Sequence, residues 1–437
     1  MNKKIVLWSI AVGLGGLLFG MDVAVISGAD KKIQQLWGLS DWVHGTAIAM
    51  ALYGTAFGAA FGNIPANKFG RKKTLIWIGI LFFVSSIGAA LAPEVYSFMF
   101  FRFISGLSIG ASSVVAPVYI SEIAPAKYRG RLVISFQLNV VSGILLAYFS
   151  NYLLQGVGGE NDWRWMLGIV ALPSLLFCLF MLAVPETPRW LLLYKNDDTH
   201  ARVVLSLTED NVEKKVEEIK ASASQKKEPL FNKKFYKPLL LTFLLATFNQ
   251  FSGINAIIYF APRVFEMAGI GKDGAFLSTV GIGVINLLFT IIGWYLIDRF
   301  GRRSLMYIGS IGYIVSLGLI AYSFETKDTA FISYYVFLFI ASHAIGQGAV
   351  IWVFLSELFP NSVRAAGTSF GCLTHWFWAA LVAQTFPFVA GSPALGPVII
   401  FGFFTAMMVL QLLFVWRMMP ETKGVALEDM DKSTILH

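Results

Sequence analysis

The sequence predicts an all-α integral membrane protein with twelve transmembrane helices in two pseudo-symmetric six-helix halves. Three observations support this fold class. The 437 residues are 56% hydrophobic and only 14% charged, whereas about one quarter of a soluble chain is charged. About a dozen apolar runs reach the roughly 20 residues that a membrane-spanning helix needs. The two halves also share repeated motifs. Because lipid-exposed backbone must satisfy its hydrogen bonds internally, the runs are expected to be helices.

The apolar runs also set the expected domain order. Residues 1–184 and 238–416 are the N-terminal and C-terminal six-helix halves, and residues 417–437 are a cytoplasmic tail. The polar stretch 185–237 is expected to be a cytoplasmic linker of short amphipathic helices without a core of its own. The expected spans are 5–28, 46–66, 74–92, 98–120, 132–153, 165–184, 238–261, 276–297, 304–323, 332–355, 367–390 and 396–416.

Three motifs recur in the same order at nearly constant offsets, which indicates that the halves are duplicates. Gly62 and Asn67-Lys68-Phe69-Gly70-Arg71-Lys72 return as Gly293 and Asp298-Arg299-Phe300-Gly301-Arg302-Arg303. Ser121-Glu122, Pro125 and Arg129 return as Ser356-Glu357, Pro360 and Arg364, and Pro185-Glu186-Thr187 returns as Pro420-Glu421-Thr422. Parallel six-span halves of this kind place a binding site between them near the middle of the membrane.

The net charge of +8 reflects topology rather than a nucleic-acid partner. With the N-terminus placed in the cytoplasm, most of the 34 Lys and Arg residues fall in cytoplasmic segments. This is the positive-inside pattern, and it puts both termini in the cytoplasm. The N-terminal apolar run contains Asp22 and no signal-peptidase-like site, so we interpret it as the first span. Short termini and the lack of an Asn-x-Ser/Thr sequon favour a bacterial cytoplasmic (inner) membrane.

The motifs resemble the sugar porter family of the major facilitator superfamily (MFS) over residues 5–425. The resemblance rests on Arg71-Lys72, Arg302-Arg303, Pro185-Glu186-Thr187-Pro188-Arg189, Pro420-Glu421-Thr422-Lys423-Gly424 and Asn249-Gln250-Phe251-Ser252-Gly253-Ile254-Asn255. The chain departs from the family at Asn67, where Asp is usual, and at Asn249, where Gln is usual. The resemblance implies the MFS fold and a bacterial sugar symporter driven by protons.

Amide side chains in the apolar spans suit a neutral, hydroxyl-rich solute, because each offers donors and acceptors without a buried charge. The candidates are Gln137, Asn249, Gln250, Asn255 and Asn286. An ideal helix would not aim both Gln250 and Asn255 inward, so Ser252-Gly253 is expected to break the span, and Gly346-Gln347-Gly348 is expected to loosen the tenth. The alternative is that each amide only bonds a neighbouring helix.

Aromatic rings can cover the C–H faces of a sugar. The resemblance places Trp352 and Trp376 at sugar-site positions, and Phe19 lies one turn before Asp22. It also aligns His343 and His375 with sugar contacts. Histidines at both places are typical of fructose-type mammalian facilitators, whereas Trp352 matches the glucose-type pattern, so the substrate is expected to be a hexose, with fructose slightly favoured over glucose or xylose.

Asp22 in the first span and Arg102 in the fourth are expected to couple transport to protons. Charges within a membrane are costly unless they are paired or functional. Burial favours a protonated Asp22, while a nearby Arg102 favours the ionised form. By resemblance, proton-coupled members carry Asp at this position and passive members carry Asn. The alternative is a static structural ion pair.

The repeated charged residues are expected to form a cytoplasmic gate. Its expected members are Arg71, Glu122, Arg129, Glu186 and Arg189 in the first half, and Arg302, Glu357, Arg364 and Glu421 in the second. A network made only in one conformation can bias a two-state equilibrium. The alternative is that these arginines serve topology alone.

These observations predict secondary active, proton-coupled import of a monosaccharide by alternating access. The partners are expected to be a sugar, a proton and the lipid bilayer, with no nucleic acid, no metal and no cofactor, and the protein is expected to be a monomer. One alternative is a passive sugar facilitator, against which Asp22 argues. Another is a transport-dead sugar sensor, which would need a longer cytoplasmic tail. An enzyme is not expected, because the sequence has no nucleophile–base pairing, zinc-type spacing or phosphate-cradling loop.

Overall fold

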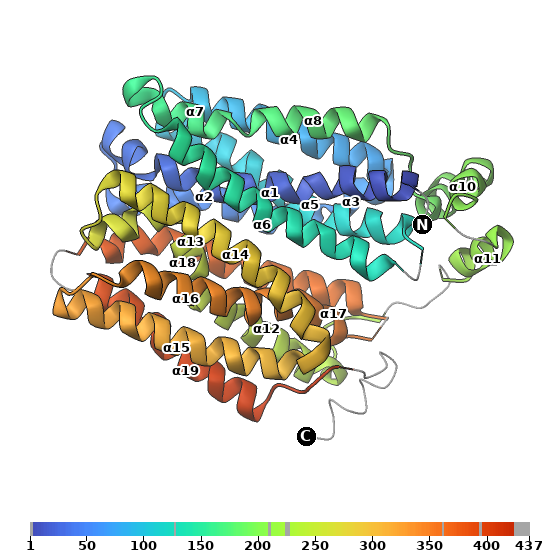
Figure 1. Ribbon diagram of the computed structural model, residues 1–437. Helices are drawn as coiled ribbons and strands as arrows, with labels where there is room; N and C mark the ends of the chain where they lie inside the picture. The colour runs from blue at the N-terminus through green and yellow to red at the C-terminus, as the bar shows by residue number, and fades with distance from the viewer. Residues whose placement is uncertain are drawn as a thin grey trace. The chain divides into compact units, whose positions relative to one another are not determined.

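The computed structural model describes residues 3–125, 128–208, 211–222, 228–360, 362–392 and 396–423, and these residues form helices and connecting loops without any strand. Figure 1 shows mostly long helices, with the short helices α10 (Asp198–Leu205) and α11 (Val212–Ser222) close to each other. The prediction of an all-α membrane fold is confirmed.

Each apolar run expected to span the membrane forms one long helix or two shorter helical segments. In the first part of the chain they are α1 (Lys3–Leu36), α2 (Asp41–Phe61), α3 (Asn63–Phe69), α4 (Arg71–Leu91), α5 (Val95–Ile123), α6 (Arg129–Leu154), α7 (Asp162–Gly168) and α8 (Ala171–Leu182). In the second they are α12 (Tyr236–Phe251), α13 (Ile254–Met267), α14 (Lys272–Phe300), α15 (Arg302–Thr326), α16 (Ile332–Ile345), α17 (Gln347–Glu357), α18 (Arg364–Ala390) and α19 (Gly396–Arg417).

Ten helical segments in the described part of the chain are long and apolar enough to cross a membrane, or up to eleven when the bent pair α2 and α3 counts as one span. Helix α18 has 27 residues and is not among them. It carries the polar side chains of His375 and Gln384, both buried in the protein. A membrane helix that buries polar residues is less apolar overall than one that faces lipid on all sides.

The chain divides into two compact units. Unit 1 comprises Met1–Val25, Met50–Ala147 and Gly156–Lys226, and unit 2 comprises Ile26–Ala49, Tyr148–Gln155 and Lys227–His437. The segments Ile26–Ala49 and Tyr148–Gln155 therefore belong with the second part of the chain. The units are thus not the same as the two halves inferred from the repeat, and the division into halves stays a prediction.

Small residues let the helices of unit 1 approach closely. A Cβ built on Gly106 of α5 would lie 2.0 Å from the carbonyl oxygen of Ala51 in α2, and one built on Gly110 would lie 2.1 Å from that of Thr55. Backbones can touch in this way only where no side chain intervenes, which is the usual device for packing helices in lipid. Helix α4 packs on α5 and α8 in the same unit.

Two helix breaks in unit 2 confirm predictions from the sequence. Helix α12 ends at Phe251 and α13 begins at Ile254, with Gly253 at φ 84°, which glycine adopts without steric cost. Helix α16 ends at Ile345, and α17 begins at Gln347 after Gly346, whose φ and ψ are −84° and −102°. Helices α12, α17 and α18 contact one another, so both breaks lie near the same group of helices.

The linker corrects one expectation, because it does contain a small hydrophobic core. It holds α9 (Pro188–Trp190), η2 (Leu191–Lys195), α10 (Asp198–Leu205), α11 (Val212–Ser222) and η3 (Lys233–Phe235). The buried residues of this cluster are Leu191, Leu192, Ala201, Leu205, Val216 and Ile219. Each short helix is too small to be stable alone, and the shared apolar cluster explains why they fold together.

Candidate functional site

The break between α12 and α13 places three predicted amides together in unit 2. Asn249 and Gln250 lie at the end of α12 and Asn255 in the first turn of α13, and all three are buried. The Oε1 atom of Gln250 accepts a hydrogen bond of 2.6 Å from Nδ2 of Asn255. Its Nε2 donates to Oδ1 of Asn249 at 2.9 Å. The helix break thus lets Gln250 and Asn255, five residues apart, meet directly.

His375 of α18 extends this cluster. Its ring nitrogens lie 3.0 and 3.2 Å from Nε2 of Gln250. The imidazole ring also lies 4.9 Å from the ring of Trp352 and 4.7 Å from that of Trp376, measured between centroids. We call Asn249, Gln250, Asn255, Trp352, His375 and Trp376 the amide–aromatic cluster. It combines amide donors and acceptors with aromatic faces, which are the two kinds of group that bind a neutral sugar.

The structure gives other contacts or surroundings for four further residues predicted for the sugar site. Asn286 of α14 is buried and accepts a bond from Thr290, one turn later. His343 of α16 contacts the hydroxyl group of Tyr313 through Nδ1 at 2.5 Å. Phe19 and Gln137 are half-buried and belong to unit 1. The structure therefore brings together the residues of α12, α13, α17 and α18 and leaves the role of these four as predictions.

Asp22 and Arg102 form a buried ion pair within unit 1. Each is only 2% exposed. Nη1 of Arg102 donates to Oδ2 of Asp22 at 3.0 Å, and the hydroxyl group of Ser105 donates to the same oxygen at 2.9 Å. Nε of Arg102 has no hydrogen-bond partner among the described residues. The ion pair is therefore formed, but one buried N–H donor of Arg102 lacks a hydrogen bond. Ser105 is a further partner of Asp22 that the sequence did not suggest.

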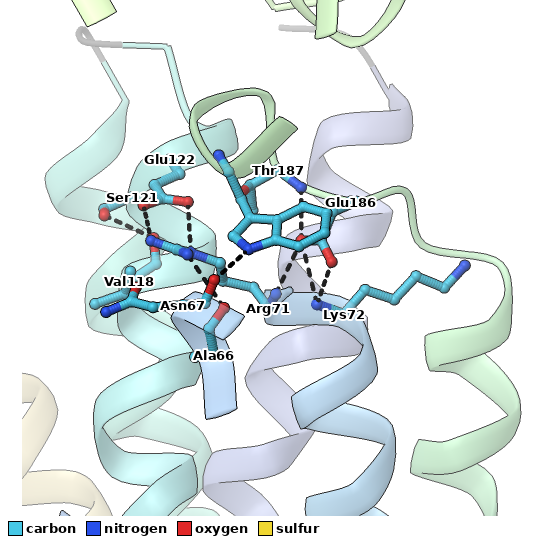
Figure 2. Close-up of polar contacts among 10 residues, drawn as sticks. Ala66, Asn67, Arg71, Lys72, Val118, Ser121, Glu122, Glu186 and Thr187 are labelled. Carbon is cyan, nitrogen blue, oxygen red and sulfur yellow. Dashed lines mark hydrogen bonds and ion pairs between the residues drawn. The ribbon is translucent and has the colours of Figure 1, made fainter. Parts of the chain in front are cut away.

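Arg71 and Glu122 pair through two parallel hydrogen bonds. Nε and Nη2 of Arg71 each lie 3.1 Å from an oxygen of Glu122, and Nη1 donates to the carbonyl oxygen of Ala66. Figure 2 shows the guanidinium group of Arg71 directed at Glu122, with the carboxylate of Glu186 on the opposite side. A bidentate pair of this kind fixes orientation as well as charge.

Glu186 binds the N-terminus of α4 rather than an arginine side chain. Its Oε1 accepts from the backbone N–H of Arg71 at 3.0 Å, and its Oε2 accepts from that of Lys72 at 3.1 Å. The first N–H groups of a helix have no partner within the helix, and a carboxylate is favoured there. Burial raises the pKa of Glu186, although bonds from the N–H groups of Thr187, Lys72 and Arg71 lower it in part.

The second half repeats this geometry residue by residue. Nε and Nη2 of Arg302 donate to Glu357 at 3.2 and 2.8 Å, and Nη1 donates to the carbonyl oxygen of Ile297. Glu421 accepts from the backbone N–H groups of Arg302 and Arg303 at 3.0 and 2.9 Å. We call the Arg71–Glu122–Glu186 group and the Arg302–Glu357–Glu421 group the two loop clusters.

Three other arginines predicted for the gate have different positions. Arg189 is exposed and makes no ion pair with Glu122 or Glu186 in the described structure. Nε of Arg364 donates to the carbonyl oxygen of Phe359 at 3.1 Å. The side chain of Arg129 lies outside the described residues. Thr422, which was not predicted, donates its hydroxyl group to Glu357 at 2.6 Å. Its place in the repeated Pro-Glu-Thr motif is the signal that could have identified it.

Comparison with known proteins identifies relatives over nearly the whole chain. A family model described as "Sugar (and other) transporter" matches residues 8–433. The arabinose-proton symporter of Bacillus subtilis is 36% identical over 444 residues, which cover 98% of this chain and 94% of the relative. The D-xylose-proton symporter of Escherichia coli K12 is 32% identical over 462 residues, with 97% and 94% coverage. The glucose transport protein of a Synechocystis strain is 34% identical, with 98% and 97% coverage.

Solved structures with the same fold also match nearly the whole chain. The inward open conformation of the xylose transporter XylE from E. coli has a TM-score of 0.87 at 32% identity, and covers 98% of this chain and 99% of that one. The partially occluded inward open conformation has a TM-score of 0.86 at 31% identity. The MFS fold expected from the motifs is confirmed.

Proposed function

Because the chain belongs to the sugar transporter family of the major facilitator superfamily, we propose that it imports a monosaccharide together with a proton by alternating access. The observation that carries the proposal is the buried pair of Asp22 and Arg102. A passive carrier has no need of an ionisable pair in its spans, and such pairs are costly. Two of the relatives, an arabinose-proton symporter and a D-xylose-proton symporter, agree with this proposal by name.

We assign sugar binding to the amide–aromatic cluster. Gln250 is its centre, because its amide group contacts Asn249, Asn255 and His375 at once. These amides hydrogen-bond to one another, so a sugar hydroxyl group can replace a protein partner without leaving a buried group unpaired. The rings of Trp352 and Trp376 would cover the C–H face of the sugar. Phe19, Gln137, Asn286 and His343 are further predicted contacts.

The proposed proton step follows from two opposing effects on Asp22, its burial and its contact with Arg102. With Arg102 at 3.0 Å, the ionised carboxylate is stabilised. If the transport cycle separates the two side chains, the buried carboxylate takes up a proton, because an unpaired charge in the spans is costly. When they meet again, the proton leaves. The direction of net movement is then set by the side of the membrane on which each event occurs.

We propose that the sugar is a hexose, with fructose slightly favoured over glucose or xylose, since His343 and His375 match the fructose-type pattern. The relatives reported above are named for arabinose, glucose and xylose. We further propose a bacterial inner membrane with both termini in the cytoplasm, where the two loop clusters would act as the gate. A monomer that rocks its two six-helix halves, residues 1–184 and 238–416, is the simplest working unit.

Counterflow in proteoliposomes tests the function directly. Vesicles are loaded with one unlabelled sugar, and uptake of labelled fructose, glucose, xylose and arabinose is measured with and without an imposed pH gradient. Exchange that a pH gradient converts into accumulation supports the proposal. Exchange without accumulation under any gradient would instead indicate a passive facilitator, and absence of exchange with every sugar would contradict sugar transport.

A further inference from the structure

Three polar residues from three helices meet in unit 2, apart from the amide–aromatic cluster. They are Asp30 of α1, His44 of α2 and Arg263 of α13. Nε of Arg263 donates to Oδ2 of Asp30 at 2.7 Å, and its Nη2 donates to Oδ1 at 3.1 Å. Nε2 of His44 lies 2.5 Å from the same Oδ1. We call these three residues the Asp30 cluster.

The Asp30 cluster is buried. Asp30 is 2% exposed, His44 0% and Arg263 9%. The first span was expected to end at residue 28, but α1 continues to Leu36 and carries Asp30 into the protein. The carboxylate is compensated by two bonds from one arginine, which is the geometry that makes a buried pair favourable. Removing either charge would leave the other unpaired and buried.

Polar side chains extend the cluster along the ends of α1 and α2. Nη2 of Arg263 also donates to Oε1 of Gln34 at 2.6 Å, and Nε2 of Gln34 donates to Oδ1 of Asp41 at 2.7 Å. Nearby, Lys31 forms a more exposed ion pair with Glu266. Helix α13 therefore contacts α1 through two ion pairs, one buried and one half-buried.

Helix α13 has a built-in hinge just before the residue that is tied. Phe260 has non-helical φ and ψ angles of −121° and 22°. Pro262 has no N–H group, so the carbonyl oxygen of Ile258, four residues earlier, loses its helical partner. The buried hydroxyl group of Tyr148 donates to that oxygen at 2.9 Å. Arg263 begins the segment after this hinge, so the Asp30 cluster holds the part of the helix that a bend would move.

We propose that the Asp30 cluster is a latch that holds the end of α13 against α1 and α2, and that it must open for the sugar to pass during the cycle. This inference rests on the proposed function for its role in transport. An ion pair suits a reversible contact, because both charges are hydrated again when they separate. An apolar contact would instead expose hydrophobic surface to water on opening, which is unfavourable. The hinge at Phe260 lets the end of α13 bend without unfolding the helix that carries Asn255.

The first test removes one charge and needs no sugar. Asp30→Asn keeps the shape of the side chain but leaves Arg263 without its counter-charge. We expect amide hydrogen–deuterium exchange in peptides from Ile254–Met267 to accelerate by at least about tenfold, because a buried pair that loses one partner favours local opening. Lys31→Gln is the matched control. It breaks the neighbouring pair with Glu266, which is more accessible to solvent and contributes less, and should leave the exchange rate within about twofold of the parent.

The second test leaves the latch residues unchanged. Lys31→Cys and Glu266→Cys are combined in a chain whose Cys178 and Cys372 are replaced by Ser, and the two thiols are joined with a short, reducible cross-linker. We expect cross-linking to abolish sugar counterflow while equilibrium binding of the sugar persists, and reduction to restore counterflow. Each single-cysteine chain, treated with the same reagent, is the control and should continue to exchange sugar.

The outcomes separate this inference from the proposed function. Unchanged deuterium exchange in Asp30→Asn would overturn the latch, and so would full counterflow in completely cross-linked protein. A parent protein that exchanges no sugar would contradict the proposed function instead, while the deuterium measurement would still decide whether the Asp30 cluster holds α13.

Discussion

The carboxylate of Glu186 lies so close to Gly70 that a Cβ built on this glycine would be 2.2 Å from Oε2. The second half repeats the relationship, with a Cβ on Gly301 placed 2.5 Å from Oε2 of Glu421. Both glycines also have positive φ angles, 102° and 85°. Each therefore serves two purposes: it turns the chain into the next helix, and it leaves room for the carboxylate that binds the helix N-terminus.

Gly70→Ala should therefore destabilise the protein, by about 1–3 kcal/mol from backbone strain alone, with the clash against Glu186 in addition. The measurement is the apparent melting temperature of the purified protein in detergent. Gly38→Ala is the matched control, since Gly38 has φ 56° but no atom within 4 Å of an added Cβ. A melting temperature for Gly70→Ala equal to that of Gly38→Ala would show that the contact with Glu186 is unimportant.

Glu186 should make stability depend on pH in a defined direction. Its pKa is raised from 4.5 by burial, so the folded protein binds the proton more tightly than the unfolded chain does. The stability that this adds is fully present below about pH 4.5 and is lost as the pH rises through the raised pKa. The melting temperature of the parent should therefore fall relative to that of Glu186→Gln between pH 4 and pH 7. A constant difference between the two proteins across that range would contradict the prediction.

The sequence could predict the contacts that the repeat carries twice. Arg71 with Glu122 and Arg302 with Glu357 follow from charged residues at matching places in the two halves. The helix breaks at Gly253 and Gly346 follow from glycines inside apolar runs. Glu186 was expected to pair with arginine side chains but binds backbone N–H groups. The prediction missed this contact because a pattern of side chains does not show which backbone N–H groups at a helix end are free.

The Asp30 cluster could not be predicted, for a related reason. Asp30, Lys31 and Lys32 form a charged run, and such a run normally marks the end of a span. The compensation of Asp30 comes from Arg263, more than two hundred residues later, through a tertiary contact. The sequence pattern shows that burying Asp30 would be unfavourable, but it does not show which distant residue compensates the charge.

Gln250→Ala should weaken sugar binding by about tenfold for each hydrogen bond to the sugar that is lost. The protein should stay folded, although Asn249 and Asn255 each lose a partner. Equilibrium binding in detergent, with melting temperature as a check on folding, gives the measurement. Gln411→Ala is the control, because Gln411 is an equally buried glutamine of unit 2 that contacts Gln347 and Ser310 instead. Equal loss of affinity in both variants would place the sugar elsewhere.

The histidines give a prediction on selectivity. We expect fructose to compete with a labelled sugar at least as well as glucose does. His375→Asn removes the imidazole next to Gln250 and should shift the ratio of the two inhibition constants towards glucose. Competition by glucose or xylose with fructose inactive would reject the preference for fructose, without affecting the assignment of the amide–aromatic cluster.

Asp22→Asn should separate driven uptake from exchange. The amide keeps the size of the side chain and can still accept a hydrogen bond from Arg102, but it cannot alternate between neutral and anionic forms. In the parent, a membrane potential of roughly 150 mV supplies about 3.5 kcal/mol per proton, enough for roughly 300-fold accumulation of the sugar. The variant should lose this accumulation and keep binding and counterflow, since the amide–aromatic cluster is unchanged.

Because Asp22→Asn also leaves the buried charge of Arg102 without its counter-charge, some loss of stability is expected with the loss of coupling. Binding, counterflow and driven uptake must therefore be measured on one preparation, with the fraction of folded protein determined by size-exclusion chromatography. Ser105→Ala is a useful second variant, because it removes a hydrogen bond to the same oxygen of Asp22 and keeps both charges. It should retain accumulation. Undiminished accumulation by Asp22→Asn would mean that the proton binds at another residue or that transport is driven in another way.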